Sequence, residues 1–282
     1  PNGRGGIVDD ILVYRVDAET YMLCVNAANI DKDWAHICAE GKAFGMEAGH
    51  GKELYNASDE ICQLAVQGPL AMKIVQKMCA EPVEEMEYYT FKKMPVAGCD
   101  AILSITGYTG SGGCEIYVAN EDGDKLWKAL WEAGEEFGLN YVLTMAYDAS
   151  QVIRDLDRKD LRFIIGPLYG TSFSVEENGK SLSLGAELEK EGVHAAISTG
   201  HPEMNLEILS TQLILMTDRG LSRKEAIRGV TAYPAEYMGI SSRVGTLEPG
   251  KDADLVIWDG DPLEYDGGVK RLFIDGEEIA LS

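Results

Sequence analysis

Two carboxylates in the first half of the chain stand where they could do chemistry. Asp10 ends the segment Gly5–Asp10, directly before a β-prone run, and Glu115 closely follows the segment Gly107–Gly110. A carboxylate can accept two parallel hydrogen bonds from a planar NH–C–NH2 edge, and a second carboxylate can stabilise positive charge that develops nearby. The plainer interpretation is a solvated turn at the two aspartates and an outward-pointing Glu115 on a strand. Of the two aspartates, Asp9 is expected on the solvated side of the turn.

In the second half, the candidate metal ligand is His201, within the segment Thr199–Pro202. A hydrolytic zinc ion needs about three protein ligands and an open position for water. One imidazole cannot supply them. We therefore interpret His201 as a structural or solvent-facing histidine and expect no bound metal.

The composition of the 282 residues limits the partners of the protein. Lys and Arg number 25 against 47 Asp and Glu, and the resulting net charge of −22 repels nucleic acids and anionic membranes. No apolar run reaches the roughly eighteen residues of a membrane span. All six cysteines precede Leu139 without CxxC spacing, which is typical of reduced thiols in a cytoplasmic protein. Pro1–Gly5 shows neither an initiator Met nor a signal pattern, so we expect a fragment or a processed product.

Short β-prone and amphipathic segments must position the two carboxylates. Strands are predicted over residues 11–16, 21–25, 61–66, 101–106 and 114–118, with a hairpin turn at Asp17–Thr20. Helices are predicted from Asp31 as N-cap, over 71–78 and over 123–137, the last with Trp127 among its buried residues. Strands interleaved with helices indicate an α+β domain.

Residues 1–139 resemble the middle of the glycine cleavage T-protein family, which are aminomethyltransferases that use tetrahydrofolate. The resemblance rests on five segments in the family's order and spacing: Gly5–Asp10, Val25–Asn29, Lys32–Trp34, Val66–Pro69 and Thr106–Gly110. It implies an enzyme that takes an aminomethyl group from a lipoyl-carrying partner, the H-protein. The enzyme releases ammonia and leaves the one-carbon unit on folate.

The resemblance also implies roles for four side chains. Asp10 matches the catalytic acidic residue near the folate nitrogens, Asn26 and Tyr108 match pterin-pocket residues, and Glu115 matches the carboxylate that binds the pterin ring. The family continues with an arginine-bearing stretch where this chain has Asn140, and the family's segment before Gly5 has no counterpart here. We therefore expect a folate-binding fragment with weak binding and little or no catalytic activity.

The second half has a different pattern, in which strands and helices alternate as in a (β/α) barrel. Strands are predicted over 141–146, 161–166 and 193–198, helices over 149–156, 184–191 and 206–219, and tail strands over 254–258 and 269–274. This half resembles the C-terminal part of imidazolonepropionase-like, metal-dependent amidohydrolases, on the segments Thr231–Ala235, Met238–Ile240 and Gly245–Val256. The resemblance implies part of a TIM barrel over 140–240 and β-sandwich strands over 241–282.

The hydrolase resemblance does not extend to the metal site. Met145 stands where relatives have a histidine, and Gly200 stands where they have an aspartate. Glu135–Leu139 fits both families, so we interpret the chain as a chimera joined there. A hydrolase acting on C–N bonds and an inactive scaffold remain the alternatives to a folate-binding protein. Three barrel strands without their neighbours leave open sheet edges, through which copies of the chain could associate as a homo-oligomer.

Overall fold

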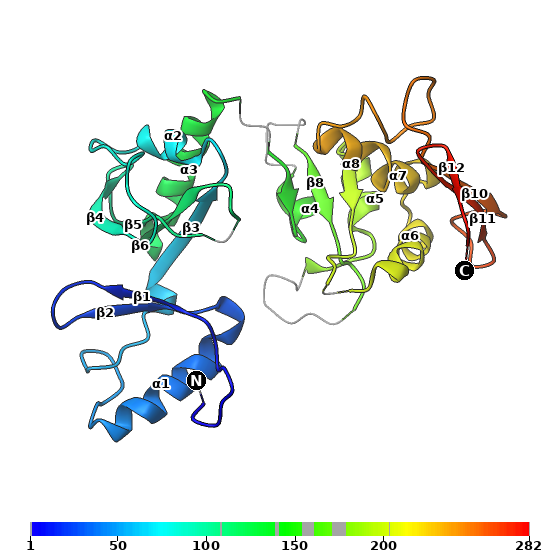
Figure 1. The fold of residues 1–282 in the computed structure, drawn as a ribbon. Coiled ribbons are helices and arrows are strands. Elements are labelled where there is room, and N and C mark those ends of the chain that lie inside the picture. The colour runs from blue at the N-terminus through cyan, green and yellow to red at the C-terminus, as the bar shows by residue number, and fades with distance from the viewer. Residues whose placement is uncertain are drawn as a thin grey trace. The chain divides into compact units, whose positions relative to one another are not determined.

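The computed structural model describes residues 2–107, 109–138, 141–153, 161–170, 179–202 and 204–281. The chain forms two compact units, Pro1–Leu139 and Asn140–Ser282 (Figure 1). Each unit has a sheet and a hydrophobic core of its own.

The first unit is built on a four-stranded antiparallel sheet with the order β3-β6-β5-β4. The strands are β3 (Ile61–Gln67), β4 (Phe91–Val96), β5 (Cys99–Ser104) and β6 (Gly113–Ala119). Alternate side chains of a strand point to opposite faces. Leu103 and Ile116 lie on the fully buried face, where they form a core with Val75 of α2 (Ala71–Gln76) and Leu126 of α3 (Gly123–Glu135).

The opposite face of this sheet meets a hairpin of β1 (Leu12–Arg15) and β2 (Tyr21–Cys24), which α1 (Ile30–Ala43) follows. The turn forms because the Asp17 carboxylate accepts the backbone N–H groups of Glu19 and Thr20. The Tyr14 ring then packs edge-on against Phe91 and Tyr117 of the sheet. The predicted hairpin is confirmed.

The second unit contains the parallel strands β7 (Leu143–Thr144), β8 (Phe163–Ile165) and β9 (Ala195–Ile197). Its helices are α4 (Ala149–Val152), α5 (Leu184–Lys190), α6 (Leu209–Asp218), α7 (Arg223–Gly229) and α8 (Ala232–Tyr237). The strands pack their apolar side chains against α5, α6 and α7 in one core. The predicted parallel strands are confirmed, and the described residues do not close into a barrel.

A separate antiparallel sheet follows, made of β10 (Leu255–Asp259), β11 (Gly268–Ile274) and β12 (Glu277–Ile279). Single 3-10 turns lie at Ala27–Asn29, Ser58–Glu60, Asn120–Asp122 and Leu206–Ile208. All six cysteines are free thiols. Among the described residues, no helix is long and apolar enough to cross a membrane.

Two sequence predictions about elements need correction, and a third extends beyond the described residues. Helix α1 begins after Asn29 as N-cap, so Asp31 lies in its first turn. The Trp127 side chain is exposed and pairs with the Trp131 ring at 5.9 Å instead of entering the core. The predicted helix 149–156 is described only as far as Ile153, and its last three residues lie outside the described part of the chain.

Candidate functional site

The two aspartates before β1 lie around the side chain of Asn26. The Asn26 amide Nδ2 donates to Asp9 Oδ1 at 2.9 Å and to the Asp10 backbone carbonyl at 3.0 Å, and it lies 3.3 Å from Asp10 Oδ1. The structure thus brings the predicted Asp10 and Asn26 together. The Asn26 hydrogen bond, followed by contact with Asp33, lowers the pKa of Asp9 to about 2.

The assignment of Asp9 to the solvated side of this turn was wrong. Asp10 is the exposed residue, whereas Asp9 is partly buried and its Oδ2 atom is inaccessible. Helix α1 causes this burial, because Lys32 Nζ donates to the Val8 carbonyl at 2.7 Å and holds the segment against the helix. Burial, followed by the neighbouring Asp9, raises the pKa of Asp33 on the same helix turn.

Glu115 lies in the centre of β6, opposite Ala65 of β3 and Ser104 of β5. Its carboxylate is buried, which excludes the outward-pointing strand position. Gln63 Nε2 donates to Oε1 at 2.6 Å, and the hydroxyls of Thr106 and Tyr117 donate to Oε2, Tyr117 at 3.3 Å.

The hydroxyl groups around Glu115 continue into the hairpin. Tyr14 OH lies 3.1 Å from Tyr117 OH and 3.5 Å from Thr106 Oγ1. Burial first, then the Cys24 thiol and Tyr14, raise the pKa of Tyr117 far above its usual range, so this phenol remains a neutral donor. The Glu115 carboxyl group is therefore held by neutral hydrogen-bond donors, and among the described residues no cation pairs with it.

A cavity of about 480 Å³ opens beside this network, on the face of the sheet that the hairpin meets. Its lining includes Met22, Ile61, Lys93, Asp100, Ile102 and Tyr117. The volume falls in the range of small-molecule sites. The lining contains neither Asp10 nor Glu115, and it reaches the Glu115 network through Tyr117.

Tyr108 lies outside the described residues, but both of its neighbours are anchored. The Gly107 carbonyl accepts the Tyr88 hydroxyl at 3.0 Å, and Thr109 Oγ1 donates to Gln67 Oε1 at 3.3 Å. The same Gln67 side chain donates to the Cys114 carbonyl, one residue before Glu115. The glycine-rich segment is thereby tied to the start of β6.

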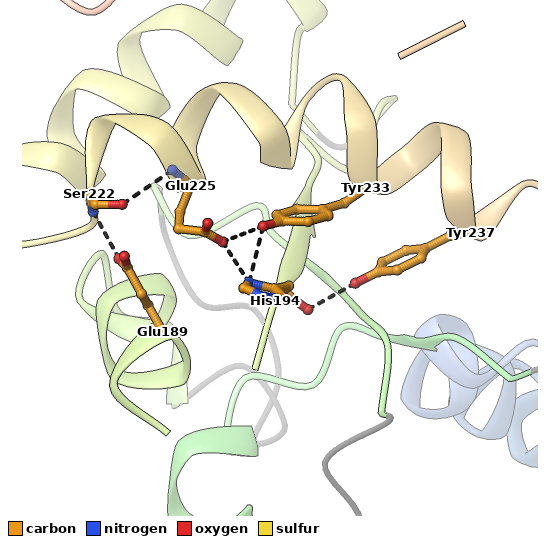
Figure 2. A network of polar contacts seen from close by, with 6 residues as sticks. All are labelled: Glu189, His194, Ser222, Glu225, Tyr233 and Tyr237. Carbon is orange, nitrogen blue, oxygen red and sulfur yellow. Dashed lines mark hydrogen bonds and ion pairs between the residues drawn. The ribbon is translucent and has the colours of Figure 1, made fainter. Parts of the chain in front are cut away.

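The second unit contains a polar network that our sequence predictions missed (Figure 2). Glu225 of α7 accepts the Tyr233 hydroxyl at 2.6 Å, and its Oε2 lies 2.7 Å from His194 Nδ1. The His194 ring stacks on Tyr233, and Tyr237 OH donates to the His194 carbonyl. Ser222-x-x-Glu225 is a capping-box signal that would have located α7, since Ser222 Oγ accepts the Glu225 N–H.

Gly200 stands where the resembled family has a metal-binding aspartate, and the space beside this glycine is crowded. A Cβ atom there would lie 2.6 Å from Pro167 Cδ, and the residue has a φ of +65°. A side chain at this position would therefore collide with the Pro167 ring unless the ring or the backbone shifts. Met145 and His201 are both exposed, and the described part of the chain holds no group of three or more His, Cys, Asp or Glu side chains that could bind a metal ion.

Comparison with known families divides the chain in two. Residues 1–154 match the GCVT N-terminal domain, and residues 194–277 match the amidohydrolase family. A solved amidohydrolase from Thermotoga maritima MSB8 is 32% identical, with a TM-score of 0.50, and the match covers 56% of this chain and 41% of that one.

Two curated relatives are named aminomethyltransferase. The protein from Phocaeicola vulgatus is 40% identical over 227 residues, which cover 79% of this chain and 58% of the relative. The protein from Porphyromonas gingivalis is 49% identical over 140 residues, which cover 49% of this chain and 37% of the relative. The chain thus spans about two to three fifths of the length of these relatives.

Proposed function

The chain belongs to the family of the GCVT N-terminal domain, and from this membership we propose that its first unit binds a reduced folate of the tetrahydrofolate type. The observation that carries the proposal is the buried Glu115 carboxyl group, which accepts hydrogen bonds from neutral donors beside a cavity of suitable size. A carboxylate acceptor suits the NH–C–NH2 edge of a pterin.

The hydrogen bonds to Glu115 must rearrange before both of its carboxylate oxygens can bind a pterin. A carboxylate offers about four acceptor positions, and Gln63, Thr106 and Tyr117 already use three. One of the two hydroxyls on Oε2 is the group to move, because Thr106 and Tyr117 both donate to that oxygen, whereas Oε1 accepts Gln63 alone and keeps one free position. Asn26 and Tyr108 complete the pterin pocket in this proposal, and Asp10 is the catalytic carboxylate near the reacting nitrogens.

Aminomethyl transfer from a lipoyl-carrying H-protein is the corresponding reaction, and we expect little or none of it from this chain. The family's arginine has no counterpart at Asn140. Such a transfer depends on holding two reactants in line. The loss of one side chain that holds a reactant, such as this arginine, therefore has a large effect on the rate.

The second unit serves as an amidohydrolase-derived scaffold in this proposal. Its parallel strands correspond to the last part of a (β/α) barrel, and β10–β12 to part of the β-sandwich that accompanies it. Hydrolysis of C–N bonds is disfavoured by the crowding at Gly200, where a side chain would collide with the Pro167 ring.

Calorimetric titration of the full chain with tetrahydrofolate tests the proposal. We expect weak, saturable binding that Glu115→Gln weakens by about 1–3 kcal/mol, because a charge-assisted pair of hydrogen bonds is lost. Glu84→Gln, at an exposed position of the same unit, is the matched control. Equal affinities of wild type and Glu115→Gln would exclude the Glu115 site.

A further inference from the structure

Two neighbouring carboxyl groups of the first unit, those of Asp9 and Asp33, have three buried oxygens that lack donors. Asp33 is 4% exposed, and both of its carboxyl oxygens, together with Asp9 Oδ2, are buried without a hydrogen bond from any described residue. The nearest cation, Lys32 Nζ, lies 3.9 Å from Asp33 Oδ1 and donates instead to the Val8 carbonyl. A buried carboxylate without a donor is strongly disfavoured.

A single proton would satisfy two of these three oxygens, one on each residue, and would leave the third as the oxygen of a neutral carboxyl group. Two adjacent carboxyl groups in one site do not both ionise easily, and the protonated one becomes a hydrogen-bond donor to the other. We propose that Asp33 holds a proton at neutral pH and donates it in a hydrogen bond to Asp9 Oδ2. Asp33 is then a positioning residue for Asp10, which rests on the role given to Asp10 in the proposed function.

The surrounding charges agree with this arrangement. Burial and Asp9 raise the pKa of Asp33, whereas the Asn26 hydrogen bond, followed by Asp33, holds that of Asp9 low. Lys32 and His36 of α1 are the other charged or titratable groups that act on Asp33, and both favour its ionised form. Burial and Asp9 outweigh them, so of the two carboxyl groups Asp33 is the one that takes up a proton more readily.

The shared proton links helix α1 to the proposed catalytic carboxylate through a short chain of contacts. Asp33 holds Asp9, Asp9 Oδ1 accepts the Asn26 amide, and the same amide fixes the backbone carbonyl of Asp10. An ionised Asp33 would repel Asp9 and so loosen both side chains that hold Asp10: Asp9, whose Oδ1 accepts the Asp10 N–H at 3.0 Å, and Asn26.

Carboxyl 13C NMR of the full chain, with 13C-labelled aspartate, tests the shared proton directly. We expect one carboxyl signal to titrate well above the usual aspartate range of about 3.9, and to disappear in Asp33→Asn. Two signals that both titrate near the usual value in wild type would overturn the proposal. A saturable shift of both signals by calcium at neutral pH would also overturn it, since the pair would then be a cation site.

Tetrahydrofolate affinity tests the positioning role. Asp33→Asn keeps a donor toward Asp9 and should bind within about twofold of wild type, whereas Asp33→Ala removes it and should bind about tenfold more weakly. Asp31→Asn is the matched control, because it removes an exposed charge from the same helix turn. Equal binding by the Asn and Ala variants would overturn the role. Wild type that does not bind folate would contradict the proposed function, while the NMR titration still decides the shared proton.

Discussion

Glu115 in the first unit and Glu225 in the second are both buried carboxylates, but different donors surround them. Among the described residues, every hydrogen-bond donor to Glu115 is neutral: an amide and two hydroxyls. Glu225 receives a hydroxyl from Tyr233 and faces His194, which can itself become a cation (Figure 2). Arg228 lies over the Tyr233 ring at 4.9 Å and adds positive charge.

The difference indicates what each carboxylate can do. Around Glu115 the net charge of the cluster remains negative, so a ligand edge rich in N–H groups can still gain from binding there. Around Glu225 the negative charge can be neutralised within the protein, and the contacts join α7 and α8 to the start of β9. We interpret the first cluster as a binding device and the second as a structural link.

The largest effect is expected from Glu115→Ala, which leaves two buried hydroxyls and the Gln63 amide without this acceptor. The free energy of unfolding of the first unit should fall by about 3 kcal/mol. Urea unfolding of a Trp258→Phe background, in which Trp34, Trp127 and Trp131 are the remaining tryptophans, measures this unit. The exposed control Glu84→Ala should change it by less than about 0.5 kcal/mol. A loss below about 1 kcal/mol for Glu115→Ala would show that these donors find other partners.

Glu225→Gln should have a somewhat smaller effect, on the second unit alone. The amide keeps one acceptor for Tyr233 but loses the charge that strengthens both contacts, at a cost of about 2 kcal/mol. Hydrogen exchange of the β9 and α7 amides reports this unit separately. The exposed Glu277→Gln is the control. Equal exchange in wild type and Glu225→Gln would contradict the structural link.

At acid pH, the wild-type protein should lose part of the stabilisation that the ionised Glu225 gives to the second unit. Burial opposes the ionised form of Glu225, but hydrogen bonds from Tyr233 and His194 outweigh it and hold its pKa below the usual range. Because the folded pKa lies below the unfolded value of about 4.3, the stabilisation is complete above that pH and is lost as pH falls through the folded pKa. The difference in unfolding free energy between wild type and Glu225→Gln should therefore shrink below about pH 4. A difference that stays constant from pH 7 to pH 3 would contradict the shifted pKa.

Elements with local signals could be predicted from the sequence, and elements defined by distant partners could not. The first hairpin forms around Asp17, whose side chain bonds its own turn. Strand β4 contains Pro95 and two lysines and does not look like a strand, but it is an edge strand that pairs only with β5, where a proline is tolerated. Helix α8 carries Pro234 in its first turn, which is also compatible with helix.

In the candidate site, too, the sequence predicts what local segments determine and misses what depends on distant packing. The segments that carry Asp10 and Asn26 predicted that these residues belong together, and the structure has them in contact. Asp33 looked like an ordinary acidic residue of a helix start, because its burial depends on how α1 packs against the segment before β1. Similarly, the capping-box pattern predicts where α7 begins, but the Glu225 carboxylate turns to His194, 31 residues earlier in the chain.

The smallest effect is expected for the His194–Glu225 pair taken alone. The His194 side chain is 54% exposed against 11% for Glu225, so water and salt screen their attraction. A double-mutant cycle of His194→Ala and Glu225→Gln should give a coupling of about 0.5 kcal/mol that decreases as salt is added. The matched cycle of Gln63→Ala and Glu115→Gln should not respond to salt, because Gln63 is neutral. A salt-insensitive coupling of about 2 kcal/mol or more at His194 would mean that both carboxylates are held in the same way, and the distinction between a binding device and a structural link would fail.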